Sequence, residues 1–378
     1  MGHQSTWPPG GHRPRRFWRF VRRAILVLIA ALILAAVPPA LFVGVKCYDL
    51  GAPRPRPRSV APPDMAGYAR SEALTFLTLP EWSIVYSADE YARFVERASP
   101  TLFPYLGAVV QYWDYYASAC GATRTVYPFE GGYHAMLGVI GVSFTVEHLI
   151  KGLYENTMGR ATAWFGHDTA EDRFGAKVAS EYATFMHTVP WYEFPFGTHL
   201  RTLWRDIPVL GSNPVRKVER RMALTTEYAA KAAYGWAIGL ATRHAYAAEA
   251  TTIHAQLEGA SEALFKDPRV EKVRETGRGA YLVRLPRHEA FTHTALALLD
   301  RRVRFRDIAG NDDILVTTIV PASLDERSLR TISVIARGPM LTDAHRRRLA
   351  LRVPVARLHE IVPELRAAGA TIEHLYDY

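Results

Sequence analysis

The sequence is poor in cysteine and contains no motif of a familiar soluble enzyme. Only Cys47 and Cys120 occur among its 378 residues, which excludes a scaffold held by many disulfides and a cysteine-rich zinc site. There is no P-loop, no G-x-G-x-x-G turn after a strand and no G-x-S-x-G nucleophile elbow. His288 and His293 lie in a segment similar to the zinc-protease motif, but they are five positions apart instead of four and would not share a helix face. These absences argue against a soluble enzyme.

The positive charge is unevenly distributed. The formal net charge is +9, yet residues 1–23 hold six arginines and no acid, and without them 40 basic residues face 37 acidic ones. A nucleic-acid-binding protein would spread its basic residues over a folded face, so no nucleic acid is expected as a partner. Arginine outnumbers lysine 39 to seven, which is typical of GC-rich bacterial genomes. We interpret residues 1–23 as a basic tail that faces the cytoplasm.

An apolar segment without charged side chains follows at residues 24–45. Its 22 residues would form about 33 Å of helix, which is enough to cross the hydrocarbon core of a bilayer. This is longer than the apolar core of a cleaved signal peptide, usually about 7–15 residues. We therefore expect a transmembrane anchor that stays attached. Residues 46–65, rich in proline and arginine, would follow as an extended linker at the membrane surface.

Residues 66–277 are expected to form a mainly helical domain that is apposed to the membrane or embedded in it. Ser87, followed by two acids, is expected to begin one helix, and Asn213-Pro214 to begin another. Apolar residues recur at helical spacing in four stretches of this domain, which are 68–79, 88–97, 170–187 and 216–258.

Three apolar stretches of this domain are candidates for entering the bilayer: 105–123, 131–146 and 232–242. Each is short or carries a charge, which is also typical of helices buried in a protein core. Aromatic residues are dense nearby, as at membrane–water interfaces. Two alternatives stay open, namely full spans or buried helices of a domain lying on the membrane. With the anchor as the only span, Cys47 and Cys120 would lie outside the cytoplasm and could oxidise.

Charged residues and histidines around the second stretch form the first candidate site. Glu130 and His134, and likewise Glu147 and Lys151, are four residues apart and would share helix faces. His134 and His148 are 14 residues apart, a spacing that could serve two stacked haems in a membrane helix. No other histidine pair of this region repeats that interval on one helix, which leaves room for at most one haem or one metal ion. The simpler alternative is an ion pair between Glu147 and Lys151, so we assign no metal ligand and favour no cofactor.

The second candidate site is an aromatic loop at residues 187–196, where two prolines interrupt any helix. Such loops can hold lipid or quinone head groups, or act only as membrane anchors. Together the two sites supply the candidate ligand-binding residues, which are Glu130, His134, Glu147, His148, Lys151, His187, Trp191 and Glu193.

The pattern changes in residues 278–378, where alternating apolar residues predict strands. Strands are expected at 280–285, 303–308, 314–320, 331–336, 349–355 and 371–376, and helices at 288–301 and 356–368. Pro363 should break the second of these helices near Val362, and Arg346-Arg347-Arg348 should form a solvated face. The order of these elements resembles a ferredoxin-like α+β sandwich.

These features predict an α+β membrane protein of the bacterial inner membrane, with its N-terminus in the cytoplasm. Its parts would be an N-terminal transmembrane helix, a helical membrane-apposed domain and a C-terminal ferredoxin-like domain. The expected function is that of an accessory or binding protein that engages membrane lipids or a membrane-protein partner. The alternative is a membrane-embedded redox or metal-dependent enzyme that uses the His/Glu cluster. The lack of a recognised chemical motif favours the first.

Overall fold

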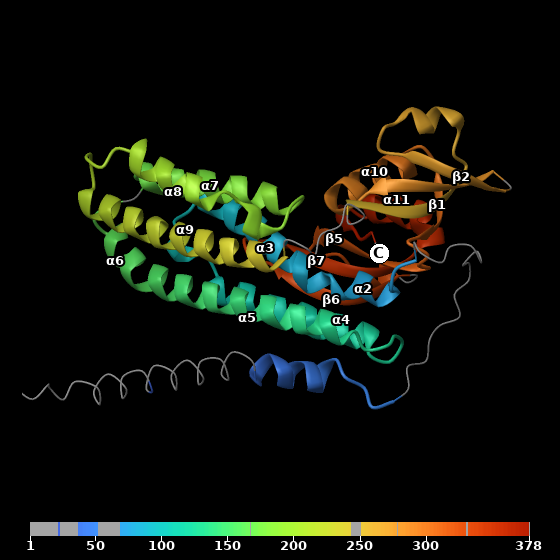
Figure 1. The fold of residues 1–378 in the computed structure, drawn as a ribbon, viewed down its shortest axis with the longest axis horizontal. Coiled ribbons are helices and arrows are strands. Elements are labelled where there is room, and N and C mark those ends of the chain that lie inside the picture. Colours follow the sequence, from blue (N-terminus) through green and yellow to red (C-terminus); the bar gives the residue numbers. More distant parts are fainter. Residues whose placement is uncertain are drawn as a thin grey trace, which may run out of the picture.

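The computed structural model combines a helical bundle with two antiparallel sheets (Figure 1). The expected tail 1–23, apart from Arg22, lies outside the described residues, as do most of the anchor 24–45 and most of the linker 46–65. The described end of the anchor is a helix, Val37–Lys46. The structure describes Arg22 and residues 37–51, 69–166, 168–242, 251–277, 279–329 and 332–377.

The bundle is built from long helices that run back and forth along one direction (Figure 1). α3 packs against α4 and α7, α4 against α5, and α9 against α7 and α8. A π-helical turn, Glu155–Gly159, joins α5 to α6. The helices are α2 (Glu72–Leu77), α3 (Leu79–Val95), α4 (Tyr105–Thr123), α5 (Gly131–Tyr154), α6 (Arg160–Ala163), α7 (Ala170–Met186), α8 (Phe196–Arg205) and α9 (Pro214–Thr242).

The expected helix starts are confirmed at one position and wrong at another. α9 begins at Pro214, where the fixed φ of proline suits the first helical position. Ser87, in contrast, is a buried residue in the middle of α3, which already begins at Leu79 with a proline in its first turn. The helix continues through Ser87 because Val85, Tyr86 and Ala92 are buried on either side of it, and this packing outweighs the local capping signal.

The three candidate membrane stretches differ in their surroundings. Residues 105–123 form α4, whose Tyr112, Tyr116 and Cys120 are completely buried in the protein. Residues 232–242 are only the last part of α9. Among the described residues, the helical segment Gly131–Ala163 is long and apolar enough to cross a membrane, and only 28% of its most apolar window is buried. Length and composition thus give weak support for membrane association through α5.

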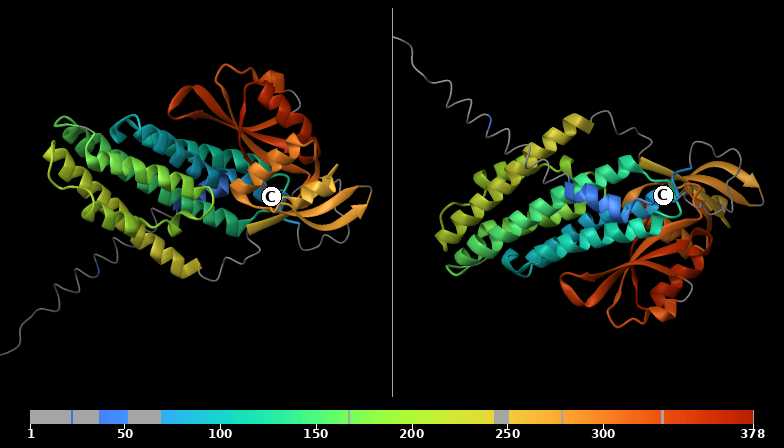
Figure 2. Two further views of the ribbon diagram at one scale, coloured as in Figure 1. Left: turned by 90° about the horizontal axis from the view of Figure 1, so that it is seen from above. Right: turned by 90° about the horizontal axis from the view of Figure 1, so that it is seen from below.

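The helix Val37–Lys46 lies against α4 and α5, as the view from below shows (Figure 2, right). The ring of Phe42 is centred 5.0 Å from that of Trp113 and 5.1 Å from that of Tyr116. A disulfide between Cys47 and Cys120 then joins the end of this helix covalently to α4. The sequence left the state of these two cysteines open.

The two sheets share one connectivity, which makes residues 252–375 an internal structural repeat. In the first, β1 (Thr252–Glu258), β2 (Glu271–Gly277), β3 (Ala280–Pro286) and β4 (Arg304–Ile308) have the order β2-β3-β1-β4, with α10 (His288–Asp300) before β4. In the second, β5 (Asp313–Pro321), β6 (Ser333–Met340), β7 (Asp343–Pro354) and β8 (Thr371–Leu375) have the order β6-β7-β5-β8, with α11 (Leu358–Ala367) before β8. The central pairs are antiparallel, with Leu257 opposite Tyr281 and Leu315 opposite Arg352.

One apolar core lies between the two sheets and joins the repeats. α10 contacts β3 and β8, whereas α11 contacts β4 and β7, so each helix touches both sheets. The outer face of the second sheet packs on the helical bundle through Leu315, Ala350 and Tyr376, which meet Phe76 and Tyr115. The second sheet is therefore enclosed between the core and the bundle.

Three expectations for this region are wrong. Residues 252–258 form β1 instead of extending the preceding helix, because Ile253, Ala255 and Leu257 alternate into the core; the first sheet thus begins upstream of the expected boundary at residue 278. Pro363 lies inside an unbroken α11, whose buried apolar residues outweigh one lost hydrogen bond. Arg348 is only 1% exposed, so it does not belong to a solvated face.

Candidate functional site

The first candidate site is a cavity of about 610 Å³ in the helical bundle, between α3, α5, α7 and α9. Apolar side chains such as Ile84, Phe144, Val178 and Leu224 line part of its wall. Charged residues from α5, α7 and α9, and from the segment that follows α3, line other parts. The cavity thus combines apolar surface with charged groups.

One group of these charged residues is a four-membered ion cluster that links α5 to α9. Lys151 Nζ lies 3.0 Å from Glu227 Oε1, and Lys231 Nζ lies 2.8 Å from Glu147 Oε1 and 3.3 Å from Glu227 Oε1. The expected pair between Glu147 and Lys151 is thus replaced by two pairs that cross to α9. Because two cations meet two carboxylates, the cluster is neutral as a whole.

Aromatic rings surround the two lysines. Lys151 Nζ lies 4.3 Å from the ring centre of Tyr91, and Lys231 Nζ lies 4.9 Å from that of Tyr182 and 5.3 Å from that of Phe196. Burial raises the pKa of both phenols, Tyr91 and Tyr182, above the ordinary value, so they stay protonated near neutral pH. The cavity therefore presents phenolic donors beside charges that are already paired.

His148 presents a hydrogen-bond acceptor in this cavity. Its Nδ1 lies 3.0 Å from the carbonyl oxygen of Phe144. Because a carbonyl only accepts, Nδ1 must carry the proton, and Nε2 keeps its lone pair in the neutral ring. The ring also lies against Phe144, with centres 3.9 Å apart.

A second, more deeply buried ion network closes the far end of the cavity at the start of α9. Arg216 is fully buried and binds Asp172 at 2.8 Å, Glu219 at 3.2 Å and the carbonyl oxygen of Gly159 at 3.0 Å. The same turns of α9 carry three more buried cations that bind Glu155, Glu171 and Glu219, and these cations are Lys217, Arg220 and Arg221. These pairs hold α9 against α7 and the π-helical turn.

The predicted residues of the aromatic loop lie away from the cavity. His187, at the end of α7, bridges Asp89 at 3.0 Å and Glu289 of α10 at 3.4 Å, so it connects the bundle to the first repeat. Burial opposes protonation of this ring, but the hydrogen bond and charge of Asp89 outweigh it and raise the pKa of His187. Trp191 packs near Tyr234, with ring centres 5.3 Å apart, and Glu193 is exposed.

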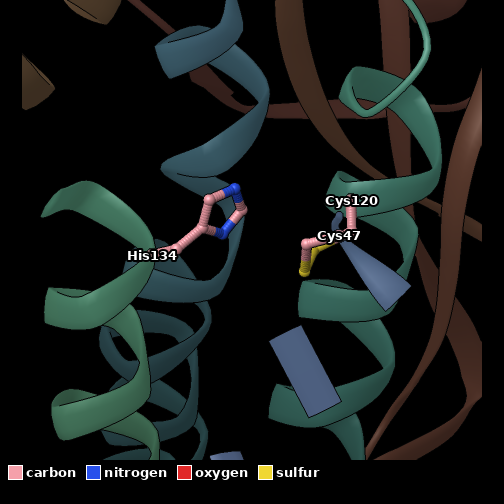
Figure 3. A group of neighbouring side chains, drawn as sticks. All are labelled: Cys47, Cys120 and His134. Atoms are coloured by element: carbon pink, nitrogen blue, oxygen red, sulfur yellow. A yellow bond between two sulfur atoms is a disulfide. The ribbon is translucent and has the colours of Figure 1, made fainter. Parts of the chain in front are cut away.

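The two remaining predicted residues lie at the start of α5. Glu130 accepts a hydrogen bond from Ser71 Oγ at 3.1 Å, which ties the start of α5 to the chain before α2. His134 is buried beside the disulfide (Figure 3), with the hydroxyl of Tyr116 3.0 Å from its Nδ1. Both are therefore separate from the cluster of Glu147, His148 and Lys151.

The structure thus brings three of the eight predicted residues together and adds Tyr91, Tyr182, Glu227 and Lys231, which the sequence reasoning missed. One feature of the sequence does indicate Glu227 and Lys231 of α9. Glu227 and Lys231 are four residues apart on a helix, and Lys231 is one of only seven lysines in an arginine-rich chain.

The chain matches none of the protein-family models, curated proteins or solved structures with which it was compared.

Proposed function

We propose that this chain is a membrane-bound binding protein whose helical bundle holds a lipid in the cavity between α3, α5, α7 and α9. The observation that carries the proposal is an inverted distribution of polarity on α5 and α9. On α9 the charged residues face the interior of the bundle and none of the described exposed residues is charged, and on α5 Lys151 is partly buried in the same way. Glu147, which pairs with Lys231, is the one exposed charged residue of α5, and its large exposed neighbours are apolar. Such an arrangement suits a lipid environment, in which buried polar groups pair with one another.

The exposed residues of α5 and α9 support contact between these two helices and lipid. On α9 the exposed positions from Pro214 to Leu240, all of them described, carry no charged side chain. On the opposite side of the bundle, α7 exposes Arg173, Lys177 and Glu181, which requires contact with water (Figure 1). The large exposed apolar residues are Met136, Val139, Val146, Leu149, Ile150 and Leu153 on α5, and Val215, Val218, Met222, Trp236 and Leu240 on α9.

The position of the N-terminal helix agrees with this proposal. Val37–Lys46, the described end of the apolar segment, packs on α4 and α5 and is joined to α4 by the Cys47–Cys120 disulfide. Disulfides are typical of compartments outside the cytoplasm. We therefore propose an inner-membrane anchor at residues 24–45 after a cytoplasmic tail at 1–23. The linker 46–65 would lie on the outer side, and the later residues would enter the lipid only through the apolar faces of α5 and α9.

The chemistry of the cavity favours a lipid over a charged metabolite. Its cluster of Glu147, Lys151, Glu227 and Lys231 is neutral as a whole, so a strongly charged ligand would gain no net attraction from this cluster. Its volume of about 610 Å³ falls within the range of about 300–1,000 Å³ that is usual for small-molecule sites. The apolar walls suit acyl or isoprenoid chains, and the phenols and His148 suit a polar head group.

We further propose that the repeats, at about 252–308 and 313–375, are two shortened ferredoxin-like sandwiches that together recognise a membrane-protein partner. Each has the antiparallel strand order and the second crossover helix of that fold. A short 3-10 turn, Glu262–Lys266 or Glu326–Leu329, stands where the first helix would lie.

A spin label on α5 tests the membrane placement. In the full chain reconstituted into vesicles, a nitroxide at Val146→Cys should be relaxed by oxygen, which dissolves in lipid, and protected from a water-soluble nickel complex. A label at Lys177→Cys on α7 is the matched control and should show the reverse accessibility. Equal exposure of both positions to the nickel complex would contradict contact between α5 and lipid.

The lipid itself can be detected by native mass spectrometry of the full chain, extracted in mild detergent. We expect about one bound lipid per chain, because the cavity accommodates one small ligand. Ala176→Phe fills the cavity wall on α7 and should reduce bound lipid to the detergent background. Ala161→Phe, at an exposed position of α6, is the control and should retain the lipid. A lipid-free wild-type protein, or retention by Ala176→Phe, would count against lipid binding.

A further inference from the structure

We propose that Cys47, Cys120 and His134 form a second site, which binds a zinc ion when the disulfide is reduced. This site is independent of the lipid cavity and of the function proposed above. Three segments of the chain meet there, namely the end of the N-terminal helix, α4 and α5. Two thiolates and an imidazole are typical zinc ligands.

The donor atoms are already close to the geometry that zinc requires (Figure 3). One ligand atom of each residue lies within 4.8 Å of the others. In a tetrahedral site with Zn–S bonds of about 2.3 Å and Zn–N bonds of about 2.0 Å, ligand atoms lie roughly 3.4–3.8 Å apart. Breaking the S–S bond lets the two sulfur atoms separate to this range, so the site needs only small side-chain movements.

The surroundings hold the donors in place. Cys47, Cys120 and His134 are 2%, 0% and 4% exposed, respectively. The ring of His134 stacks on Phe129 with centres 4.6 Å apart, and the hydroxyl of Tyr116 lies 3.0 Å from its Nδ1. Contacts of this kind orient a metal-binding histidine and restrict its motion.

A neighbouring cavity provides room for a fourth ligand and a path for the ion. This cavity of about 260 Å³ is lined by Cys47 and His134 and also by Asp49 and Arg124, which are exposed. It is therefore open to solvent on one side and reaches the donors on the other. A water molecule in it would complete four-coordinate zinc.

The redox step is a thiol–disulfide exchange. A dithiol attacks the Cys47–Cys120 bond, is itself oxidised to a disulfide, and leaves Cys47 and Cys120 as two thiols. Zinc then binds the two sulfur atoms and releases both thiol protons. The metal would take over the role of the S–S bond, since both link the N-terminal helix to α4. The link between the N-terminal helix and α4 would thus depend on the redox state of the two cysteines and on zinc.

Zinc titration of the full chain in mild detergent tests this site. The disulfide is reduced with a phosphine, which becomes its oxide with oxygen from water and is removed before zinc is added. We expect one tightly bound zinc ion per reduced chain and none per oxidised chain. Cobalt(II) in place of zinc should give thiolate-to-metal charge-transfer absorption, which reports the sulfur ligands directly.

Substitutions separate a metal ligand from a structural histidine. His134→Ala should weaken zinc binding by at least tenfold, whereas His134→Cys should restore it, because a third thiolate replaces the imidazole. His199→Ala is the matched control, since His199 also stacks on a phenylalanine, Phe194, in the same bundle. Absence of binding by the reduced wild type, equal binding by the oxidised form, or unchanged binding by His134→Ala would each overturn the proposal.

Discussion

Replacing Arg348 by methionine is expected to lower the free energy of unfolding by about 3–5 kcal/mol, because two carboxylates then lose their cation in the interior. Arg348 lies on β7 and is 1% exposed. Its guanidinium lies 3.3 Å from Glu90 of α3 and 2.6 Å from Glu373 of β8, and above the ring of Tyr86. This single side chain therefore ties the second sheet to the helical bundle.

Urea unfolding of the full chain in mild detergent measures the effect. Arg346→Met, two positions earlier on the same strand, is the matched control and should cost less than about 1 kcal/mol, since its bond to Thr371 is exposed. Adding Glu90→Gln to Arg348→Met should recover part of the loss, because it removes one unpaired carboxylate. Equal losses for Arg346→Met and Arg348→Met would contradict a central role for the buried pair.

The loss caused by Arg348→Met should also depend on pH. Burial already raises the pKa of Glu90, and Arg348 opposes this shift, so removing Arg348 raises that pKa further. A carboxyl with a raised folded-state pKa binds more protons when folded than when unfolded, and stability then falls as the pH rises above about 4.5. The variant should therefore lose more stability at pH 8 than at pH 5. A loss independent of pH would show that the carboxylates do not carry the effect.

The second large effect is expected for Glu171→Gln on α7. Glu171 is fully buried and accepts hydrogen bonds from Lys217 Nζ at 2.8 Å and from Arg221 at 2.6 Å. Its loss leaves two buried cations of α9 without their carboxylate, which should cost about 3–5 kcal/mol. Glu181→Gln, at an exposed position of the same helix, should change stability by less than about 1 kcal/mol.

The pH dependence of Glu171 has the opposite sign to that of Glu90 in the Arg348 variant. Burial raises the pKa of Glu171, but Lys217 and Arg221 outweigh burial and hold the pKa below its ordinary value of 4.5. Its contribution is therefore complete above about pH 4.5 and is lost as the pH falls through the folded-state pKa. Thermal unfolding of wild type and Glu171→Gln should converge in acid and separate towards neutral pH. If the stabilities of the wild type and Glu171→Gln differed by the same amount at every pH, the ionised carboxylate of Glu171 would not be the source of the difference.

The C-terminal elements show how far local patterns predict this fold. The strand expected at 280–285 is β3, and the helix expected at 288–301 is α10. The alternation of apolar residues that predicts strands is a property of neighbouring residues, so a sequence contains it directly. The repeat went unnoticed because it lies in the order in which strands pair, and pairing joins residues that are distant along the chain.

The candidate site was predicted only in part for a similar reason. Glu147, His148 and Lys151 stood out because they interrupt an apolar helix. Their partners Glu227 and Lys231 come from a helix about 80 residues later, and only the packing of α9 on α5 brings them together. Helical spacing alone pointed to a bond between Glu147 and Lys151.

By itself, the sequence determined the apolar N-terminal segment, the start of α9 at Pro214 and most C-terminal elements, because chain length, proline geometry and apolar periodicity act locally. Only the tertiary structure decided that α3 passes through Ser87, that α11 continues through Pro363 and that Arg348 is buried. It also decided which faces of α5 and α9 are exposed and that Cys47 meets Cys120. In each case the free energy comes from contacts between distant segments. These contacts outweigh local preferences, which are about 1 kcal/mol for a capping serine and about 3 kcal/mol for a proline inside a helix.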